Sequence, residues 1–256
     1  MRDSFDYATY WDLLTRISAT HRVVPFADFG SGAEPGEPFC ILRHDVDYSP
    51  RAALRLAEQE AGRGVRATYF LLAGTSYYNL LAPEHAGFAR RLSELGHEVG
   101  LHYDVNSFVG FPREEWPRLL RAQAALVGEL AGAPVVSIAM HQPALNGDDP
   151  FRGTDVGFIN AYDDRFTREA TYVSDSCRAW RNSGWELLLA DAFPRRLHLC
   201  LHPINWSDVD RDRMSIFRDV HEELTANLAA ARDELLGKIA CHAGVLEHDA
   251  RGRGVA

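Results

Sequence analysis

The sequence predicts a single α/β domain in which about seven parallel strands form a closed or nearly closed β/α barrel. Short apolar runs alternate along the chain with amphipathic stretches, a pattern typical of strand–helix–strand units. Polar residues follow directly after several of the apolar runs, at the edge where β/α barrels assemble their sites. No glycine-rich dinucleotide-binding motif follows the first strand, so a barrel is favoured over an open doubly wound sheet.

The N-terminal half is expected to contain three strands separated by helices. Pro50 marks the start of one helix, and Gly62 and Gly64 mark its end. The expected elements are, in order, a helix at 6–20, a turn-rich connection at 31–38, a strand at 39–42, a helix from about 50 to 62, a strand at 67–72, a helix at about 85–95, a strand ending near 102 and a helix at 112–131.

The C-terminal half is expected to complete the barrel and to end in one or two helices. The expected strands lie at 135–140, 157–160, 171–173 and 197–201, and the closing helices at 210–246. The sequence contains no internal repeat, low-complexity tract or obvious linker. One domain over 1–256 is therefore predicted, with a core at about 39–206 on which the terminal helices pack.

Composition excludes several classes of partner. The chain has 256 residues, 46% of them hydrophobic, and a formal net charge of −9 at pH 7. It has no basic block for a phosphate backbone or an anionic membrane, and no apolar run near the roughly 18 residues of a membrane span. The N-terminal sequence lacks the basic start and apolar stretch of a signal peptide. A soluble, cytoplasmic protein is expected.

The four cysteines are widely scattered, without the close pairs of structural zinc sites or dithiol motifs. They are Cys40, Cys177, Cys200 and Cys241. Buried free thiols are expected, and a nucleophilic role for Cys177 or Cys200 is the alternative.

The segment Arg-His-Asp-Val-Asp holds two acids two residues apart. On an extended backbone, the carboxylates of Asp45 and Asp47 point to the same side. Two like charges so close are tolerated if a cation neutralises one and the other serves as a base. The alternative is an acidic turn that caps the helix beginning near Pro50.

Histidines follow three further strands. His97 and His102 are five residues apart, so in a strand they lie on opposite faces, and His102 at the strand end is the better ligand candidate. His141 precedes Gln142 and Pro143, which end a strand, and it is either displayed at the site or a turn histidine. In the segment 197–202, alternation places three leucines on one face and His198, Cys200 and His202 on the other.

Five segments in this order resemble the polysaccharide deacetylases, carbohydrate esterase family 4. The segments are Arg-His-Asp-Val-Asp, Gly-His-Glu-Val-Gly with the following histidine, His-Gln-Pro, Asp175 to Trp180, and Leu-Cys-Leu-His ending at 202. The resemblance spans roughly 39–206, about two thirds of the chain. It implies a distorted, often seven-stranded β/α barrel.

The resemblance also implies roles for the acids and histidines. Asp45 corresponds to the general base, and Asp47 and His102 correspond to metal ligands. Asn106 stands where many members have a second histidine, and the third segment lacks the usual arginine that positions the base. These departures suggest His141 as the third ligand, with Asp104 and Asn106 as competitors.

The last two segments supply the acid and the acyl pocket. By resemblance, His202 is the general acid and Asp175 tunes it, while Trp180 and Leu201 line the pocket for the acyl group. Aromatic residues near the strand ends are further candidates for substrate contact, namely Tyr78, Tyr103, Tyr162 and Trp206. One divalent ion is expected, zinc first, with cobalt, manganese, iron or nickel as alternatives.

The function implied is metal-dependent hydrolysis of a carbon–nitrogen bond other than a peptide bond. The expected reaction removes an acetyl group from an N-acetylated sugar or a sugar-like biosynthetic intermediate. One rival is a hydrolase of a small cyclic amide, ureide or formamide. Another is a sugar-binding barrel without catalysis, suggested by Asn106 and the missing arginine. The sequence does not predict the oligomeric state.

Overall fold

The computed structural model describes residues 4–30, 38–181, 184–190 and 192–252. The turn-rich connection expected at 31–38 therefore lies, except for Pro38, outside the described residues. The chain divides into two compact units, Met1–Arg213 and Met214–Ala256. The sheet and the candidate site belong to the first unit.

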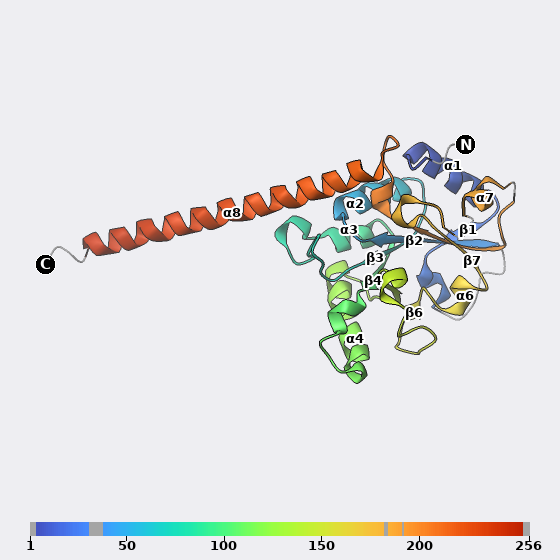
Figure 1. Ribbon diagram of the computed structural model, residues 1–256, viewed down its shortest axis with the longest axis horizontal. Helices are drawn as coiled ribbons and strands as arrows, with labels where there is room; N and C mark the ends of the chain where they lie inside the picture. The colour runs from blue at the N-terminus through green and yellow to red at the C-terminus, as the bar shows by residue number, and fades with distance from the viewer. Residues whose placement is uncertain (1–3, 31–37, 182–183, 191, 253–256) are drawn as a thin grey trace. The chain divides into compact units, whose positions relative to one another are not determined.

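The first unit is built on one parallel sheet (Figure 1). Its strands lie in the order β6-β5-β4-β3-β2-β8-β7, and β1 pairs with the first half of β2. The strands are β1 (Arg22–Val24), β2 (Phe39–Val46), β3 (Thr68–Leu71), β4 (Glu98–Tyr103), β5 (Ser137–Met140), β6 (Ile159–Asn160), β7 (Thr171–Ser174) and β8 (Arg196–Leu201). Among the described strands, β6 and β7 do not pair, so the curled sheet forms a half barrel. This confirms the distorted β/α barrel and its seven predicted strands.

Among the described residues, the first unit contains the four expected helices and three short ones that the sequence did not predict. They are α1 (Tyr7–Ser18), α2 (Pro50–Ala61), α3 (Phe88–Glu94), α4 (Trp116–Ala131), α5 (Pro143–Asn146), α6 (Asp164–Thr167) and α7 (Gly184–Leu189), with short 3₁₀ turns at 26–29, 83–85, 105–108, 113–115, 176–178 and 203–205. The side chain of Ser49 caps α2 by accepting a hydrogen bond from the backbone amide of Ala52, and Gly132 ends α4 in the left-handed conformation. Helix α2 packs on β2, and α3 and α4 pack on β4.

Alternation along the strands separates two faces of the sheet. On β2, Cys40 and Leu42 join the large core cluster under α1 to α4, while Phe39 and Ile41 join a smaller aromatic cluster on the inner face. The inner face becomes polar toward the carboxyl ends of the strands. There a side chain at Gly100 would lie 2.4 Å from the ring of Phe70, so this position of β4 requires glycine.

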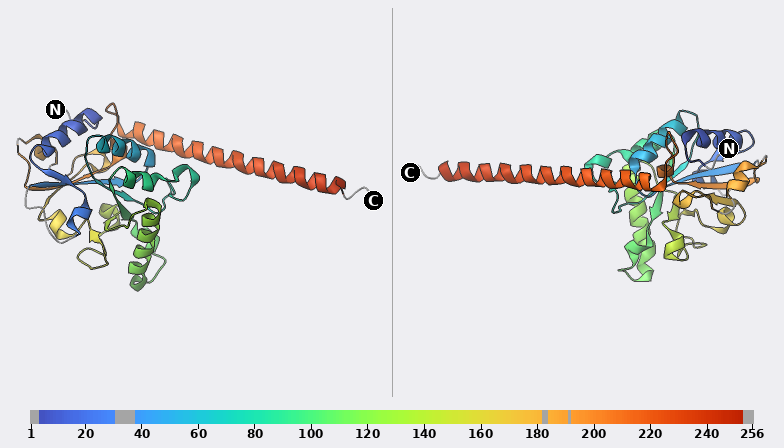
Figure 2. Two further views of the ribbon diagram at one scale, coloured as in Figure 1. Left: turned by 180° about the vertical axis from the view of Figure 1, so that it is seen from behind. Right: turned by 45° about the horizontal axis from the view of Figure 1, so that its top comes forward.

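The described part of the second unit is one helix, α8 (Arg213–Gly252), which runs without a break in both views of Figure 2. One helix is thus observed where the sequence predicted one or two. Packing of the terminal helix on the core stays a prediction. No helix within the described ranges is both long and apolar enough to cross a membrane.

Candidate metal centre and active site

The candidate site lies at the carboxyl ends of five parallel strands. Asp45 is the penultimate residue of β2, Asp47 follows that strand, and His102 is the penultimate residue of β4. His141 follows β5, and Asp175 and His202 follow β7 and β8. Because these strands run parallel in one sheet, the residues that follow them meet at one edge of the sheet.

Asp47, His102 and His141 converge on one point. Oδ1 of Asp47 lies 3.3 Å from Nε2 of His102 and 3.3 Å from Nδ1 of His141, and the two ring nitrogens are 3.0 Å apart. Two ligand atoms about 2.0–2.2 Å from a shared divalent ion, seen from it at about 90–110°, stand roughly 2.8–3.6 Å apart. The three atoms therefore have the spacing of one face of a coordination sphere.

Two further observations fit a cation at this point. Oδ1 of Asp47 is buried and has no hydrogen-bond partner, which is costly for a carboxylate oxygen unless an ion takes that place. Nδ1 of His102 donates to the carbonyl of Ala139 at 2.9 Å, which leaves the lone pair of Nε2 directed at Asp47. Burial alone would raise the pKa of Asp47, but the surrounding imidazoles of His102, His141 and His202 lower it well below its usual range.

The competing ligands are engaged elsewhere. Oδ1 of Asp104 accepts the backbone amide and the side-chain amide of Asn106, and Asn106 also donates to Asn146 at 3.1 Å. Among the described residues, Asp104 belongs to no group of three acids, cysteines or histidines close enough to share an ion. His141, and not Asp104, therefore lies with Asp47 and His102, and its role as the third ligand stays a prediction.

A second group, Asp45, Cys200 and His202, is also compact enough to surround an ion. Its acid, however, is already paired with the buried cation Arg43, whose charge opposes a second ion nearby. The burial of Cys200 raises the pKa of its thiol, which disfavours the thiolate that a metal needs. This group is therefore the poorer metal site.

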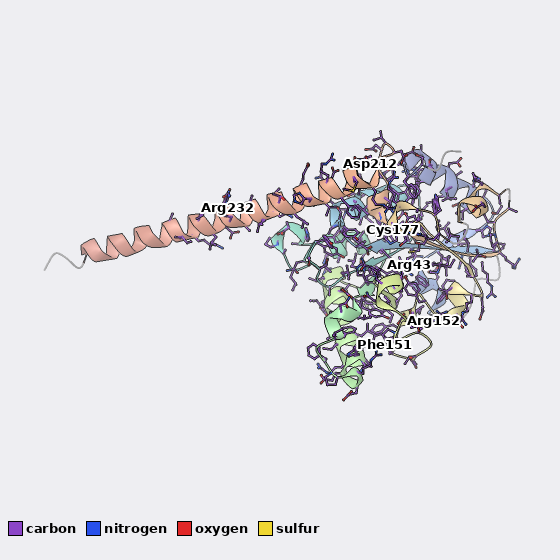
Figure 3. The ribbon with its side chains drawn as sticks, in the orientation of Figure 1. Arg43, Phe151, Arg152, Cys177, Asp212 and Arg232 are labelled. Atoms are coloured by element: carbon purple, nitrogen blue, oxygen red, sulfur yellow. The ribbon has the colours of Figure 1, made fainter. Side chains whose placement is uncertain are left out.

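Arg43 holds Asp45, a contact that the sequence did not predict. Both residues are on β2 and buried, and Nε and Nη2 of Arg43 donate to the two oxygens of Asp45 at 2.7 Å each. The guanidinium also donates to the hydroxyl of Tyr162 at 2.9 Å and lies over the rings of Tyr162 and Phe70. Figure 3 labels Arg43 among the side chains of the first unit. Burial alone would raise the pKa of Asp45, but Arg43 lowers it well below its usual range, so the carboxylate stays ionised. The sequence did indicate that Arg43 and Asp45 lie on the same face, because residues two apart in a strand share a face.

His202 is oriented by Asp175. Its Nδ1 donates to Oδ1 of Asp175 at 2.6 Å, while the other ring nitrogen lies 3.9 Å from Oδ2 of Asp47. The indole of Trp206 donates to Oδ2 of Asp175 at 2.9 Å, which fixes the carboxylate. Burial alone would lower the pKa of His202, but the paired Asp175 raises it to about 9. His202 thus presents Nε2–H toward the candidate metal point.

The aromatic and aliphatic candidates for substrate contact differ in exposure. Tyr103 is fully buried and donates to Asp149, and Trp206 is buried and engaged with Asp175. Leu201 belongs to the core under the helices, and Trp180 is half-buried and stacked on Phe5. Tyr162 is half-buried and bound to Arg43, and the hydroxyl of Tyr78 is buried against the backbone of Val46. The roles predicted for them stay predictions.

Two tyrosines beside the site were missed. Tyr48 follows Asp47, is half-buried, and meets the ring of Tyr77 edge-on at 4.7 Å between centroids. The pKa of Tyr48 is raised to about 12, mainly by burial and then by Asp47. Tyr77 remains 41% exposed. The signal was weak, because an aromatic residue in a loop is common.

Three further expectations are tested by the structure. Ser49, not Asp45 or Asp47, caps α2, so the acidic-turn interpretation is wrong. Burial was expected for all four cysteines, and it holds for Cys40 and Cys200, whereas Cys177 and Cys241 are exposed. His97 lies on the helix side, with its ring 3.0 Å from the carbonyl of Ala57, as the alternation predicted.

No protein-family model matches the sequence, and no curated protein matches it significantly. Solved structures do match. A carbohydrate esterase family 4 pseudoenzyme from Bacillus anthracis has a TM-score of 0.44 and 15% identity over 76% of this chain and 63% of that one. A polysaccharide deacetylase from Bacillus cereus has a TM-score of 0.44 and 15% identity over 73% and 87% of the two chains.

A third similar structure is a peptidoglycan deacetylase from Bacillus subtilis, with a TM-score of 0.42 and 16% identity over 78% and 87% of the two chains. The match spans slightly less than two thirds of the pseudoenzyme, and 65% of a mutant of it with restored activity. Their names agree with the family that the five segments resemble. At these identities and TM-scores they carry no activity or residue role to this chain.

Proposed function

We propose that the protein is a metal-dependent amide hydrolase that removes an acetyl group from an N-acetylated sugar or a sugar-like intermediate. The observation that carries the proposal is the convergence of Asp47, His102 and His141 within 3.0–3.3 Å of one another. Asp45 lies next to them, with Oδ2 3.9 Å from Nε2 of His102. The acetylated sugar itself rests on the resemblance of the five segments.

The donor set fits a divalent ion such as zinc. One carboxylate oxygen and two imidazole nitrogens are ligands that zinc prefers in catalytic sites, and the same set suits cobalt, manganese, iron or nickel. When bound there, such an ion would lower the pKa of a water molecule and polarise an amide carbonyl. Asp47, His102 and His141 would hold it.

Asp45 is suited to take a proton from water. The bidentate contact with Arg43 fixes the plane of the carboxylate and keeps it ionised. Oδ2 accepts a second hydrogen bond from Sγ of Cys200 at 3.6 Å, whereas Oδ1 keeps a second lone pair that can accept a proton. The position of the attacking water would therefore be set by the free lone pair of Oδ1.

His202 is suited to give a proton to the leaving amine. Its Nδ1–H is committed to Asp175, so its other nitrogen carries the proton that can be donated. That nitrogen is on the side of Asp47, opposite the anchored Asp175. Base and acid thus come from β2 and from the end of β8, on neighbouring strands.

The experiment that tests the proposal measures acetate release by the purified full chain. The chain is stripped of metal, reloaded separately with zinc, cobalt or manganese, and supplied with N-acetylglucosamine and its short oligomers. Parallel reactions with cyclic ureides and with formamides test the rival hydrolase. We expect acetate release that depends on the added metal and is lost in Asp45→Asn.

Two outcomes would contradict the proposal. Turnover of a ureide or formamide without any acetate release would assign the site to the rival reaction. Saturable sugar binding without turnover under every metal would favour a binding protein.

A further inference from the structure

The buried carboxylate of Asp175 is shared between His202 and Trp206. Oδ1 accepts Nδ1–H of His202 at 2.6 Å and the backbone amide of His202 at 3.0 Å, whereas Oδ2 accepts the indole N–H of Trp206 at 2.9 Å. The other contact of Oδ2, with the backbone amide of His202, is longer, at 3.3 Å. Trp206 thus makes the shorter of these two hydrogen bonds to Oδ2, and it fixes the rotation of the carboxylate.

The indole of Trp206 is itself held by aromatic rings. Its ring lies 5.1 Å from that of Tyr10, 5.3 Å from that of Phe5 and 6.0 Å from that of Trp180, measured between centroids. Phe5 is also stacked on Trp180 at 5.5 Å. Rings packed against several of its sides leave the buried indole little freedom to turn, so they set the direction of its N–H.

Two of these rings belong to residues 5–10, which we call the N-terminal segment. Its backbone is bonded to the residue after Trp206, because Tyr7 donates its amide to the carbonyl of Ser207 at 2.8 Å and Ser207 donates to the carbonyl of Phe5 at 3.4 Å. The amide of Phe5 also donates to Asp210 at 3.1 Å. Terminal segments are poorly ordered unless such contacts hold them. The N-terminal segment is therefore tied to the loop that carries Trp206.

We propose that Trp206 is a positioning residue for His202, which it orients through Asp175, and that the N-terminal segment keeps the indole in place through Phe5. The inference rests on the proposed function, in which His202 gives a proton to the leaving amine. A carboxylate that could rotate would hold the imidazole in several orientations, whereas proton transfer requires one. The alternative for Trp206 is the substrate contact that the sequence predicts.

The first test removes the indole N–H and measures kcat and KM for acetate release by the metal-loaded full chain. The test variant is Trp206→Phe. The matched control is Trp116→Phe, because the buried indole of Trp116 donates in the same way to the carbonyl of Phe111, at 3.1 Å. We expect Trp206→Phe to lower kcat roughly tenfold or more with KM unchanged, since the lost hydrogen bond is to a charged group. Trp116→Phe should change neither constant.

A second replacement separates the hydrogen bond from the packing. Benzothienylalanine in place of Trp206 keeps the shape of the ring and lacks the N–H donor, so it keeps the test decisive if Trp206→Phe does not fold. The same loss of kcat is expected. Circular dichroism and the melting temperature of each variant show whether the chain is folded.

A proton resonance tests the positioning without any turnover. The Nδ1 proton of His202 lies in a short hydrogen bond to a carboxylate, so its resonance lies far downfield. The spectrum is recorded on the full chain with and without zinc, and the signal is assigned by its loss in His202→Gln. We expect it to shift or broaden in both variants at position 206 and to stay unchanged in Trp116→Phe. If the wild type releases no acetate, this result would support the positioning of His202 and contradict the proposed hydrolysis alone.

A double-mutant cycle tests the role of Phe5. Phe5→Leu should lower kcat by about two- to tenfold, in line with the loss of aromatic contacts. In the Trp206→Phe background the same substitution should have little further effect, because no indole N–H remains to be positioned. The resonance of His202 should follow the same pattern.

Two outcomes would overturn the role of Trp206. One is a rise in KM with kcat unchanged in both variants at position 206, which would make Trp206 a substrate contact. The other is an unchanged kcat and resonance in these variants, or an equal change in Trp116→Phe. An equal effect of Phe5→Leu with and without the indole would overturn the role of the N-terminal segment.

Discussion

Two buried clusters on opposite faces of the sheet combine the same kinds of side chain and differ in whether their carboxylate oxygens have hydrogen-bond partners. On the inner face are Asp47, His102 and His141. On the outer face is the Glu60 cluster, which we define as Glu60, Tyr10, His44, Tyr69 and His97. Both place a carboxylate among histidines, and β2 contributes to both because His44 alternates with Arg43 and Asp45.

The difference lies in hydrogen bonding. In the Glu60 cluster, Oε1 accepts from Tyr10 and contacts His44 at 2.8 Å, and Oε2 accepts from Tyr69 at 2.7 Å, so the carboxylate has no room for an ion. In the inner cluster, Oδ1 of Asp47 has no hydrogen-bond partner and faces two ring nitrogens. A buried carboxylate whose oxygens all accept hydrogen bonds stabilises the fold. A buried carboxylate oxygen without a hydrogen-bond partner, next to imidazole nitrogens, indicates a place for a ligand.

The largest expected effect is the loss of a metal ligand. Asp47→Ala, His102→Ala and His141→Ala are each expected to remove the bound metal and to reduce acetate release by about a thousandfold or more, since metal assistance supplies several kcal/mol. Glu60→Gln is the matched control and should retain the metal. Metal content by mass spectrometry checks this. Loss of metal in Asn106→Ala but not in His141→Ala would contradict the assignment.

Loss of the base is expected to have the next largest effect. Asp45→Asn should reduce acetate release by about 10²–10⁴, the range for a positioned general base, while metal content is unchanged. The measurement is kcat at saturating substrate together with metal per chain. A variant that loses its metal would show that Asp45 is a ligand instead.

Removal of Arg43 is expected to destabilise the fold as well as the reaction. In Arg43→Met, Asp45 becomes a buried charge without a partner, which typically costs about 3–5 kcal/mol. The double variant Arg43→Met with Asp45→Asn removes both charges and should recover much of that loss. Unfolding in urea measures both. Equal stability of the single and the double variant would argue against the ion pair.

The Glu60 cluster is expected to give a smaller effect that depends on pH. Burial alone would raise the pKa of Glu60, but His44 lowers it below the ordinary glutamate value of 4.5, so the folded pKa lies under the unfolded one. The stabilisation by ionised Glu60 is therefore complete above about pH 4.5 and is lost as the pH falls through the folded pKa. The stability difference between wild type and Glu60→Gln should shrink on acidification. A difference that grew instead would refute this account.

The smallest expected effect concerns the tyrosines beside the site. Tyr77→Ala should raise KM by about 2–10-fold and leave kcat unchanged, in line with aromatic contacts of about 0.5–1.5 kcal/mol. Val109→Ala, an exposed residue in the loop after β4, is the control and should change neither constant. An unchanged KM in Tyr77→Ala would place substrate elsewhere.

Much of the fold followed from patterns of period two and 3.6. The seven strands that the sequence predicted are present, and Pro50, Gly62 and Gly132 lie where their helices begin or end. Strand β1 was not predicted.

The site was predictable where it depends on strand ends and less so where it depends on side-chain pairing. The convergence of Asp47, His102 and His141 follows from their position at the carboxyl ends of parallel strands in one sheet. The burial of Tyr103 does not, because its partner Asp149 comes from a loop 46 residues away in sequence. Likewise, Arg43 could be placed on the face of Asp45 but not in contact with it, since the contact depends on rotamers.

X-ray absorption spectroscopy of the zinc-loaded full chain tests the central claim most directly. The account predicts one ion per chain, bound by two imidazole nitrogens and a carboxylate oxygen, with one imidazole lost in His141→Ala. A bound ion whose spectrum contains sulfur in place of imidazole, or a chain that retains no ion at all, would contradict it.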